Sequence, residues 1–321
     1  MFDNDASRIG LKLWLCPERG VTSTAVLREA LLDLAELRRV YARQMLALAN
    51  ALADTRLEDA FAAVPRESFL GEGPWRILTP WSPYTTVPER DPALIYQDVV
   101  VALDEERGVN NGSPSLHARW MHLVSPRRGE RIAHVGAGVG YYSAILAELV
   151  GNEGLVAAVE YDAGRAQRAT DNLKDRSNVE VIAADGRRWP QQAADVIYVN
   201  FATPRPADMW IDNLAVGGRL IFPLGIPRES PTGGGWRGLN ALALSVTRRS
   251  QGFAASVLGQ VSFVFVEGEE HTRSDEEVRI LQGSLEKGGW ERIRSLVWNE
   301  PVDEAQCWLK GDGWALSFKD P

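Results

Sequence analysis

Short apolar runs alternate with helical patterns between residues 131 and 223 of this 321-residue chain. Continuous apolar runs are typical of strands that are buried on both faces of a parallel sheet. Such runs predict five strands, at residues 132–135, 155–159, 179–183, 195–199 and 216–223. Apolar residues at helical spacing predict helices between them, at residues 143–150, 163–173 and 206–214. Strands that alternate with helices predict an α/β fold with a doubly wound, mostly parallel sheet.

Two later apolar runs extend this sheet. Residues 239–246 and 257–266 predict two further strands, which make a seven-stranded sheet. The glycine-rich segment before them, residues 230–236, predicts a flexible loop that could cover a site on the sheet.

Segments on both sides of this region predict additions to a main domain of residues 56–270. Residues 22–54 have apolar positions at helical spacing and predict one long amphipathic helix in an N-terminal extension, residues 1–55. That helix either packs on the main domain or forms a homodimer interface. Residues 271–321 predict a small C-terminal addition. Its expected elements are a helix at 275–287 and short strands at 297–298 and 314–318.

The turn after the first strand carries Gly136, Gly138 and Gly140. Glycine permits a tight turn close to a ligand, and the helix that follows offers free N–H groups. A dinucleotide-binding turn has the spacing G-x-G-x-x-G, whose third glycine would fall on Tyr141. The bulk of Tyr141 argues against NAD. The spacing G-x-G-x-G favours S-adenosylmethionine (SAM) instead, because SAM contains no pyrophosphate and the turn needs to surround only its ribose and amino acid. A glycine turn without a ligand is the third interpretation.

Polar residues follow the next strands at their carboxyl ends, where open α/β sheets bind ligands. The carboxylate of Glu160, which Tyr161 follows, could accept hydrogen bonds from a ribose diol. Asp185 could accept from an adenine amino group, while Gly186 leaves room for the ring. Asn200 follows the fourth strand. We therefore predict a SAM site from these residues, Tyr141 and the glycine turn; a solvated strand end and an ordinary Asp-Gly turn are the alternatives.

Four segments resemble the protein-L-isoaspartate O-methyltransferases. Residues 59–70 are similar to the family's A-F-x-x-V-P-R-x-x-F signature, and residues 112–121 to its serine-proline-histidine segment. Residues 194–199 and 214–225 are similar to its fourth and fifth strands. The likeness extends from about residue 57 to about residue 266. It implies a Rossmann-like class I methyltransferase that uses SAM.

The resemblance also implies roles for single residues. The family's active-site serine stands two residues before the proline, and that position is Gly112 here, with Ser113 next to it. The histidine three residues after the proline helps to hold the cofactor and is His117. An acidic residue usually stands two residues before the first glycine, where this chain has His134. These departures lie on the substrate side, so an ordinary aspartyl substrate is an alternative to an isoaspartyl one.

A carboxylate acceptor needs no general base, because a carboxyl group of ordinary pKa is ionised at neutral pH. The enzyme must align the carboxylate with the methyl group and exclude water. Neutral donors near residue 112 could orient the carboxylate, so we predict a catalytic segment of Asn111, Gly112 and Ser113; a solvated turn is the alternative. We predict carboxyl methylation of a protein or peptide. The alternatives are methylation of a small-molecule oxygen or nitrogen and a non-catalytic SAM-binding scaffold.

Composition narrows the expected partners. A net charge of −8 argues against a nucleic-acid partner. No apolar run approaches the ~18 residues of a membrane span, and the first residues lack a signal-peptide pattern, so we expect a cytoplasmic enzyme. Cys16 and Cys307 form no disulfide or metal pattern, and 269–271 (Glu-Glu-His) is interpreted as a loop, so no metal is expected.

Overall fold

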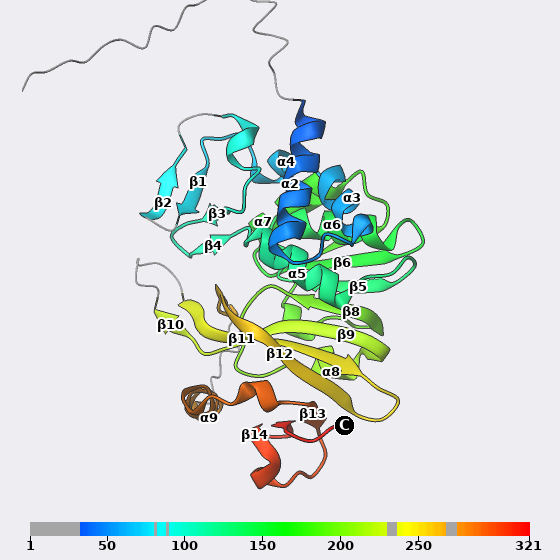
Figure 1. The fold of residues 1–321 in the computed structure, drawn as a ribbon, viewed down its shortest axis with the longest axis vertical. Coiled ribbons are helices and arrows are strands. Elements are labelled where there is room, and N and C mark those ends of the chain that lie inside the picture. The colour runs from blue at the N-terminus through cyan, green and yellow to red at the C-terminus, as the bar shows by residue number, and fades with distance from the viewer. Residues whose placement is uncertain (1–32, 80–81, 88–89, 230–235, 268–274) are drawn as a thin grey trace, which may run out of the picture. The chain divides into compact units, whose positions relative to one another are not determined.

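The predicted parallel strands form the centre of the main sheet in the computed structural model of the chain (Figure 1). The structure describes residues 33–79, 82–87, 90–229, 236–267 and 275–321. The predictions for residues 1–32, 230–235 and 269–271 lie outside the described residues.

Five strands pair in parallel at the centre of this sheet. In spatial order they are β7 (Val179–Ala183), β6 (Leu155–Glu160), β5 (Arg131–Val135), β8 (Ala194–Val199) and β9 (Leu214–Leu224). The antiparallel strands β11 (Trp236–Arg248) and β12 (Phe253–Val264) continue the sheet from β9. All seven predicted strands are therefore present. The order of the strands reverses between β5 and β8, which is where open α/β sheets form a ligand crevice.

The sheet is larger than the sequence predicted, because the C-terminal segment joins it. Within the described residues it has 11 strands rather than seven. The register pairs Phe253 with Leu296 and Ala254 with Ser295, so the addition extends the sheet beyond β12. Its strands are β13 (Ser295–Trp298), β14 (Cys307–Lys310) and β15 (Trp314–Ser317), and β10 (Arg228–Glu229) pairs with β11. The pairing covers part of an edge that would otherwise expose unpaired backbone groups.

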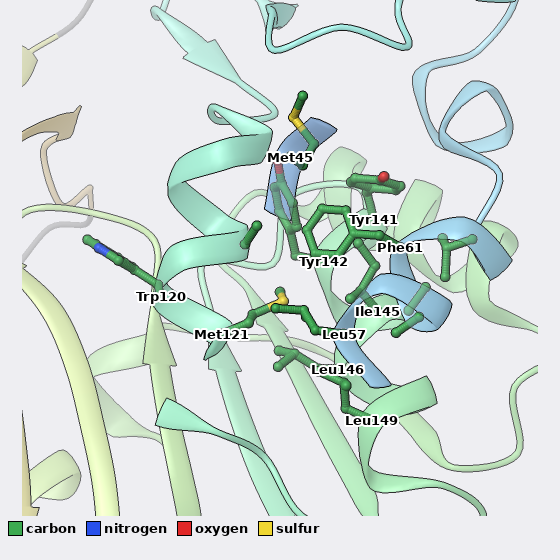
Figure 2. Packing of buried hydrophobic residues seen from close by; sticks show 14 of the residues in the cluster. Met45, Leu57, Phe61, Trp120, Met121, Tyr141, Tyr142, Ile145, Leu146 and Leu149 are labelled. Carbon is green, nitrogen blue, oxygen red and sulfur yellow. The ribbon is translucent and has the colours of Figure 1, made fainter. Parts of the chain in front are cut away.

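Helices cover both faces of the sheet. On one face Ile132 and Tyr198 belong to a hydrophobic core to which six helices contribute, and Figure 2 shows part of this core. The six helices are α2 (Leu34–Leu48), α3 (Thr55–Ala63), α4 (Arg66–Leu70), α5 (Pro114–Val124), α6 (Tyr141–Val150) and α7 (Ala163–Leu173). On the other face Ala133 and Val199 pack with α8 (Asp208–Asp212) and α9 (Asp275–Lys287). The alternation of neighbouring residues between the two cores is the expected consequence of strand geometry.

The N-terminal helix is shorter than predicted at its carboxyl end. α2 ends at Leu48 rather than at residue 54, and Asn50 has a φ of +57° in the turn that follows. Asp54 then caps a separate helix, α3, by accepting a hydrogen bond of 3.2 Å from the Leu57 N–H. An aspartate is a strong helix N-cap, which is why the chain starts a new helix there. Tyr41 and Met45 of α2 are buried in the core, so the helix packs on the domain.

A small antiparallel sheet, in the order β2-β1-β3-β4, was not predicted. Its strands are β1 (Arg76–Thr79), β2 (Ser82–Thr86), β3 (Val100–Asp104) and β4 (Val109–Asn110), and α4 (Arg66–Leu70) precedes it. The buried side chain of Arg66 donates hydrogen bonds to the carbonyl oxygens of Ile95, Gln97 and Val99. Arg66 therefore fixes the segment that leads into β3, and β3 in turn positions the residues after β4.

Candidate active site

A cavity of about 330 Å³ lies at the carboxyl ends of the central strands. Residues of β3, β4 and the end of β12 form its other walls. This volume is in the range of small-molecule sites. Of the thirteen residues predicted for the site, all line the cavity except Gly140. The structure thus brings together the segments that the sequence assigned separately to cofactor and to catalysis.

Gly140 lies behind the glycine turn and has a packing role. It has a φ of +92° at the start of α6, and an added Cβ would lie 2.6 Å from Cδ1 of Leu173. A side chain there would push α6 away from α7. Gly140, which was predicted to bind the cofactor, does not line the cavity, and its lack of a side chain lets the two helices approach each other.

Glu160 is held in one orientation at the end of β6. Its carboxylate is 5% exposed and accepts hydrogen bonds from the backbone N–H of Gly138 at 2.8 Å and of Asp162 at 3.1 Å. The Nε of Arg165 donates a third bond of 3.0 Å. Each carboxylate oxygen has two lone pairs, so Oε2, which receives only the Gly138 bond, can accept another. Glu160 thus both braces the glycine turn and offers an acceptor to the cavity.

Asp185 and Gly186 form a short turn after β7. Burial opposes ionisation of Asp185, but hydrogen bonds from the side chain and the backbone of Arg187 lower its pKa below the usual value. The carboxylate also caps its own turn through the Arg187 N–H at 3.0 Å. An added Cβ on Gly186 would collide with Cγ1 of Val135. The turn therefore lies tightly against β5 with an ionised acceptor at the cavity wall.

His134 and Asn200 meet at the ends of β5 and β8. His134 is fully buried; its Nδ1 is 2.7 Å from Oγ of Ser143, and its Nε2 is 2.7 Å from Nδ2 of Asn200. Burial lowers the pKa of His134 to about 3, so the ring is neutral. Among the described residues, no group donates to the buried Oδ1 of Asn200. Asn200 lines the cavity, so this acceptor is a candidate ligand contact.

As far as the structure describes the chain, Asn111 has an unpaired hydrogen-bond donor, whereas Asn200 has an unpaired acceptor. Its Oδ1 accepts a 2.7 Å hydrogen bond from the Val101 N–H, and its own N–H donates to the Val101 carbonyl at 3.0 Å. Its Nδ2 is buried and has no acceptor in the part of the chain that the structure describes. Buried polar groups nearly always have a partner, so this unpaired donor on a cavity-lining residue is a candidate ligand contact.

Gly112 and Ser113 show why the family's serine is absent from its position. Gly112 has a φ of +72°, and an added Cβ would collide with Nε2 of His117. A serine at 112 is therefore incompatible with this histidine and this backbone. Ser113 is the N-cap of α5, accepting from the Leu116 N–H at 3.4 Å and donating to Oδ1 of Asp98 at 3.0 Å.

His117 is buried in the cavity wall rather than on the helix surface. Its ring stacks on Tyr142 with centroids 3.7 Å apart, and its Nδ1 lies 2.9 Å from the hydroxyl of Tyr198. Burial, with smaller contributions from the interactions with His134 and Arg66, lowers its pKa well below the usual value. A neutral, doubly held ring suits a contact surface for a ligand better than a proton carrier.

Two features of the site were missed by the sequence interpretation. Phe263 of β12 lines the cavity and stacks on Trp120 with centroids 5.1 Å apart. Arg107 joins three segments by pairing with Asp162 at 2.9 Å and with Glu267 at 2.5 Å. No local pattern indicates these contacts, because each joins residues that are far apart in the chain.

Two other kinds of site, a metal-binding cluster and a membrane-spanning helix, are absent from the described ranges. No cluster of three or more histidine, cysteine or acidic residues there could hold a metal ion. No helix in those ranges has both the length and the apolar character needed to span a bilayer.

The fold is that of the class I methyltransferases, and two solved structures share it. One is a protein-L-isoaspartate O-methyltransferase (TM-score 0.56, 23% identity), with 71% of this chain and 66% of that chain covered. The other is a putative protein-L-isoaspartate O-methyltransferase from Plasmodium falciparum, solved in complex with S-adenosyl-L-homocysteine (TM-score 0.54, 18% identity). The match covers 72% of this chain and 99% of that one.

The family is defined more closely by sequence. The model of the protein-L-isoaspartate(D-aspartate) O-methyltransferase family matches residues 44–232, more than half of the chain, and the chain belongs to that family. It is 34% identical over 177 residues to a protein-L-isoaspartate O-methyltransferase of Aeropyrum pernix, covering 54% of this chain and 61% of that protein. It is 34% identical over 143 residues to one of Archaeoglobus fulgidus, covering 43% and 65%. The chain thus spans less than two thirds of the length of these relatives.

Proposed function

We propose that this chain is a SAM-dependent carboxyl O-methyltransferase that acts on isoaspartyl or aspartyl side chains of proteins or peptides. The observation that carries the proposal is the pair of unpaired polar atoms at one cavity. Asn111 Nδ2 offers a donor to an anion, and Asn200 Oδ1 offers an acceptor to a cation. The reaction requires both kinds of ligand, a carboxylate and a cationic methyl donor. Family membership supports the same activity.

The cavity residues fit SAM as the cofactor. Glu160 would accept from the ribose hydroxyls, and Asp185 and Gly186 would border the adenine together with Tyr161. The backbone of Gly136 and Gly138 approaches the cavity without side chains, and His117 forms part of the wall. Bound SAM supplies an electrophilic methyl group on a sulfonium.

The catalytic task of the protein is to orient the substrate and to exclude water. Asn111 Nδ2 would donate to one oxygen of the substrate carboxylate and leave the other free to attack. A neutral donor orients the carboxylate without neutralising it, whereas an arginine would hold it and reduce its nucleophilicity. Phe263 and the stacked His117 and Tyr142 provide an apolar wall. Such a dry site favours a reaction in which opposite charges are lost.

Turnover on a peptide carboxylate is expected to be independent of pH between about pH 6 and about pH 8. The pKa values of His117 and His134 are both lowered, so both rings are already neutral throughout that interval. The substrate carboxylate is ionised there as well. The measurement is the pH profile of kcat; an inflection near the usual histidine pKa, lost in His117→Gln, would assign a proton-transfer role to this ring.

Asn111→Asp tests the substrate role directly. The variant keeps an acceptor for the Val101 N–H but replaces the donor in the cavity by an anionic oxygen. We expect kcat/KM for peptide to fall roughly 10- to 100-fold, the scale of one hydrogen bond to a charged group. S-adenosylhomocysteine affinity should stay within about twofold, as measured by calorimetry. A parallel loss of cofactor affinity would contradict this assignment and place Asn111 against the cofactor.

Ser113→Ala is expected to lower turnover more than cofactor affinity. Its hydroxyl caps α5 and is held by Asp98, so its loss loosens the segment that carries Asn111. Loss of a helix cap costs about 1 kcal/mol. The matched control is Ser115→Ala, which also removes a hydroxyl bound to Asp98 but not one that lines the cavity. Equal losses of turnover and of cofactor affinity would move Ser113 to the cofactor site.

The substrate class is tested by transfer of a labelled methyl group from SAM to three acceptors. An isoaspartyl peptide, its aspartyl counterpart and a mixture of small hydroxyl and amine compounds would be compared. Transfer to either peptide supports the proposal and selects the substrate. Transfer only to small compounds, or cofactor binding without any transfer, would favour the two alternatives that the sequence left open.

We further propose that residues 56–270 are the catalytic domain, with 1–55 and 271–321 as additions, and that the chain forms a homodimer through its N-terminal helix. The face of α2 that carries Tyr41 and Met45 packs on the domain, whereas Val40 and Leu48 are 48% and 64% exposed and would supply the dimer contact. Sedimentation equilibrium of the full chain tests the dimer, and a monomer at micromolar concentration would rule it out.

A further inference from the structure

We infer that Asn200, positioned by His134, forms a neutral receptor for the α-ammonium group of the cofactor's amino-acid end. The inference rests on the proposed function. It concerns the position at which the resemblance implies an acidic residue and this chain has His134. The ligand group is an ammonium on a tetrahedral carbon, next to a carboxylate.

Both ring nitrogens of His134 are engaged in hydrogen bonds. The Nδ2 group of Asn200 donates to Nε2 of His134, so Nε2 carries no hydrogen in this arrangement. The hydrogen of the neutral ring then lies on Nδ1 and is donated to Ser143 Oγ. Because both nitrogens of a fully buried ring are engaged, the ring cannot turn without breaking both bonds. His134 is thus a positioning residue. It holds the nitrogen of the Asn200 amide, so that the amide oxygen is the atom left for a ligand.

Within the described ranges, this arrangement leaves the side-chain oxygen of Asn200 without a hydrogen-bond partner. Oδ1 of Asn200 is buried, and no donor among the described residues reaches it. The Asn200 backbone N–H donates to the Val135 carbonyl at 2.8 Å, which places the residue beside the glycine turn. An unpaired carbonyl oxygen repels a carboxylate and attracts an N–H donor. The amino-acid end of SAM has one such donor, the ammonium, and it lies on the side of the sulfonium away from the adenosine.

The side chain at position 134 carries no charge in this chain. An acid at position 134 would provide a negative charge under the cofactor, whereas His134 has a pKa of about 3 and provides none. The amide oxygen at Asn200 supplies an acceptor without that charge. Residues 134 and 200 therefore act as one unit, in which the buried neutral histidine holds the amide and the amide offers the acceptor.

The experiment compares two ligands by calorimetry. S-adenosylhomocysteine has the ammonium, and 5′-methylthioadenosine has the same adenosine and thioether without the amino-acid end. In Asn200→Ala we expect S-adenosylhomocysteine affinity to fall roughly 10- to 100-fold, the scale of one charged hydrogen bond. Affinity for 5′-methylthioadenosine should change less than about twofold. His134→Leu should show the same selectivity with a smaller loss, and the control Tyr161→Ala should weaken both ligands alike.

A second measurement does not depend on the folding of any variant. Nitrogen-15 NMR of the histidine side chains in the wild-type protein should show His134 as the Nδ1–H tautomer, with Nε2 unprotonated. The Nε2–H tautomer would turn the Asn200 oxygen towards the ring and overturn the inference. Equal losses for both ligands in Asn200→Ala would also overturn it. Wild-type protein that binds neither ligand would instead count against the proposed function itself.

Discussion

Arg66→Met is expected to lower the free energy of unfolding by about 3–5 kcal/mol, the scale for a buried charged group with several hydrogen bonds. The guanidinium is fully buried, and its NH1 and NH2 groups donate to three carbonyl oxygens between Ile95 and Val99. Methionine fills much of the volume but leaves these carbonyl oxygens without donors. Because the same segment carries Asp98 and leads into β3, turnover should be lost together with stability.

Denaturant unfolding at equilibrium measures this effect. The matched control is Arg43→Met, since Arg43 is 67% exposed and makes one 3.4 Å ion pair with Glu58. Exposed pairs of that kind contribute roughly 0–1 kcal/mol. Arg66→Lys keeps the charge but cannot reach all three carbonyls, and it should be intermediate. Equal stability of the Arg66→Met and Arg43→Met proteins would mean that Arg66 does not hold this segment.

The central strands were predictable because they are continuous apolar runs in the sequence. β5 and β8 are buried almost throughout, whereas the edge strand β7 is only partly buried. The boundaries predicted for residues 163–173 and 179–183 match α7 and β7. The small sheet from Arg76 to Asn110 was not predicted, because its strands are short and mix polar with apolar residues. The addition of β13–β15 to the main sheet could not be predicted from spacing either. It depends on the edge that β12 leaves open, which is a property of the tertiary fold.

The candidate site also has features that could be predicted from the sequence and features that could not. Glu160, Asp185 and Asn200 were found because the carboxyl ends of parallel strands meet at one edge of a sheet, a rule that needs only the strand assignment. The pairing of His134 with Asn200 was not found, since these residues are 66 positions apart and meet only across β5 and β8. The collision that excludes a serine at 112 required the position of the His117 ring.

Glu160→Gln is expected to weaken binding of S-adenosylhomocysteine by about 1–3 kcal/mol, the scale of lost hydrogen bonds to a charged group. The variant keeps the shape of the side chain. It removes the negative charge of the carboxylate, which accepts hydrogen bonds from Arg165 and from the Gly138 N–H. An amide has one oxygen rather than two, so it cannot satisfy Gly138, Asp162, Arg165 and a ribose diol together. The amide N–H group would also face donors that are already in place.

The control is Glu180→Gln, which changes an exposed glutamate on the adjacent strand β7; this variant protein should bind S-adenosylhomocysteine like the wild type. Calorimetry compares the three proteins; wild-type affinity in Glu160→Gln would show that the end of β6 does not bind the cofactor's ribose.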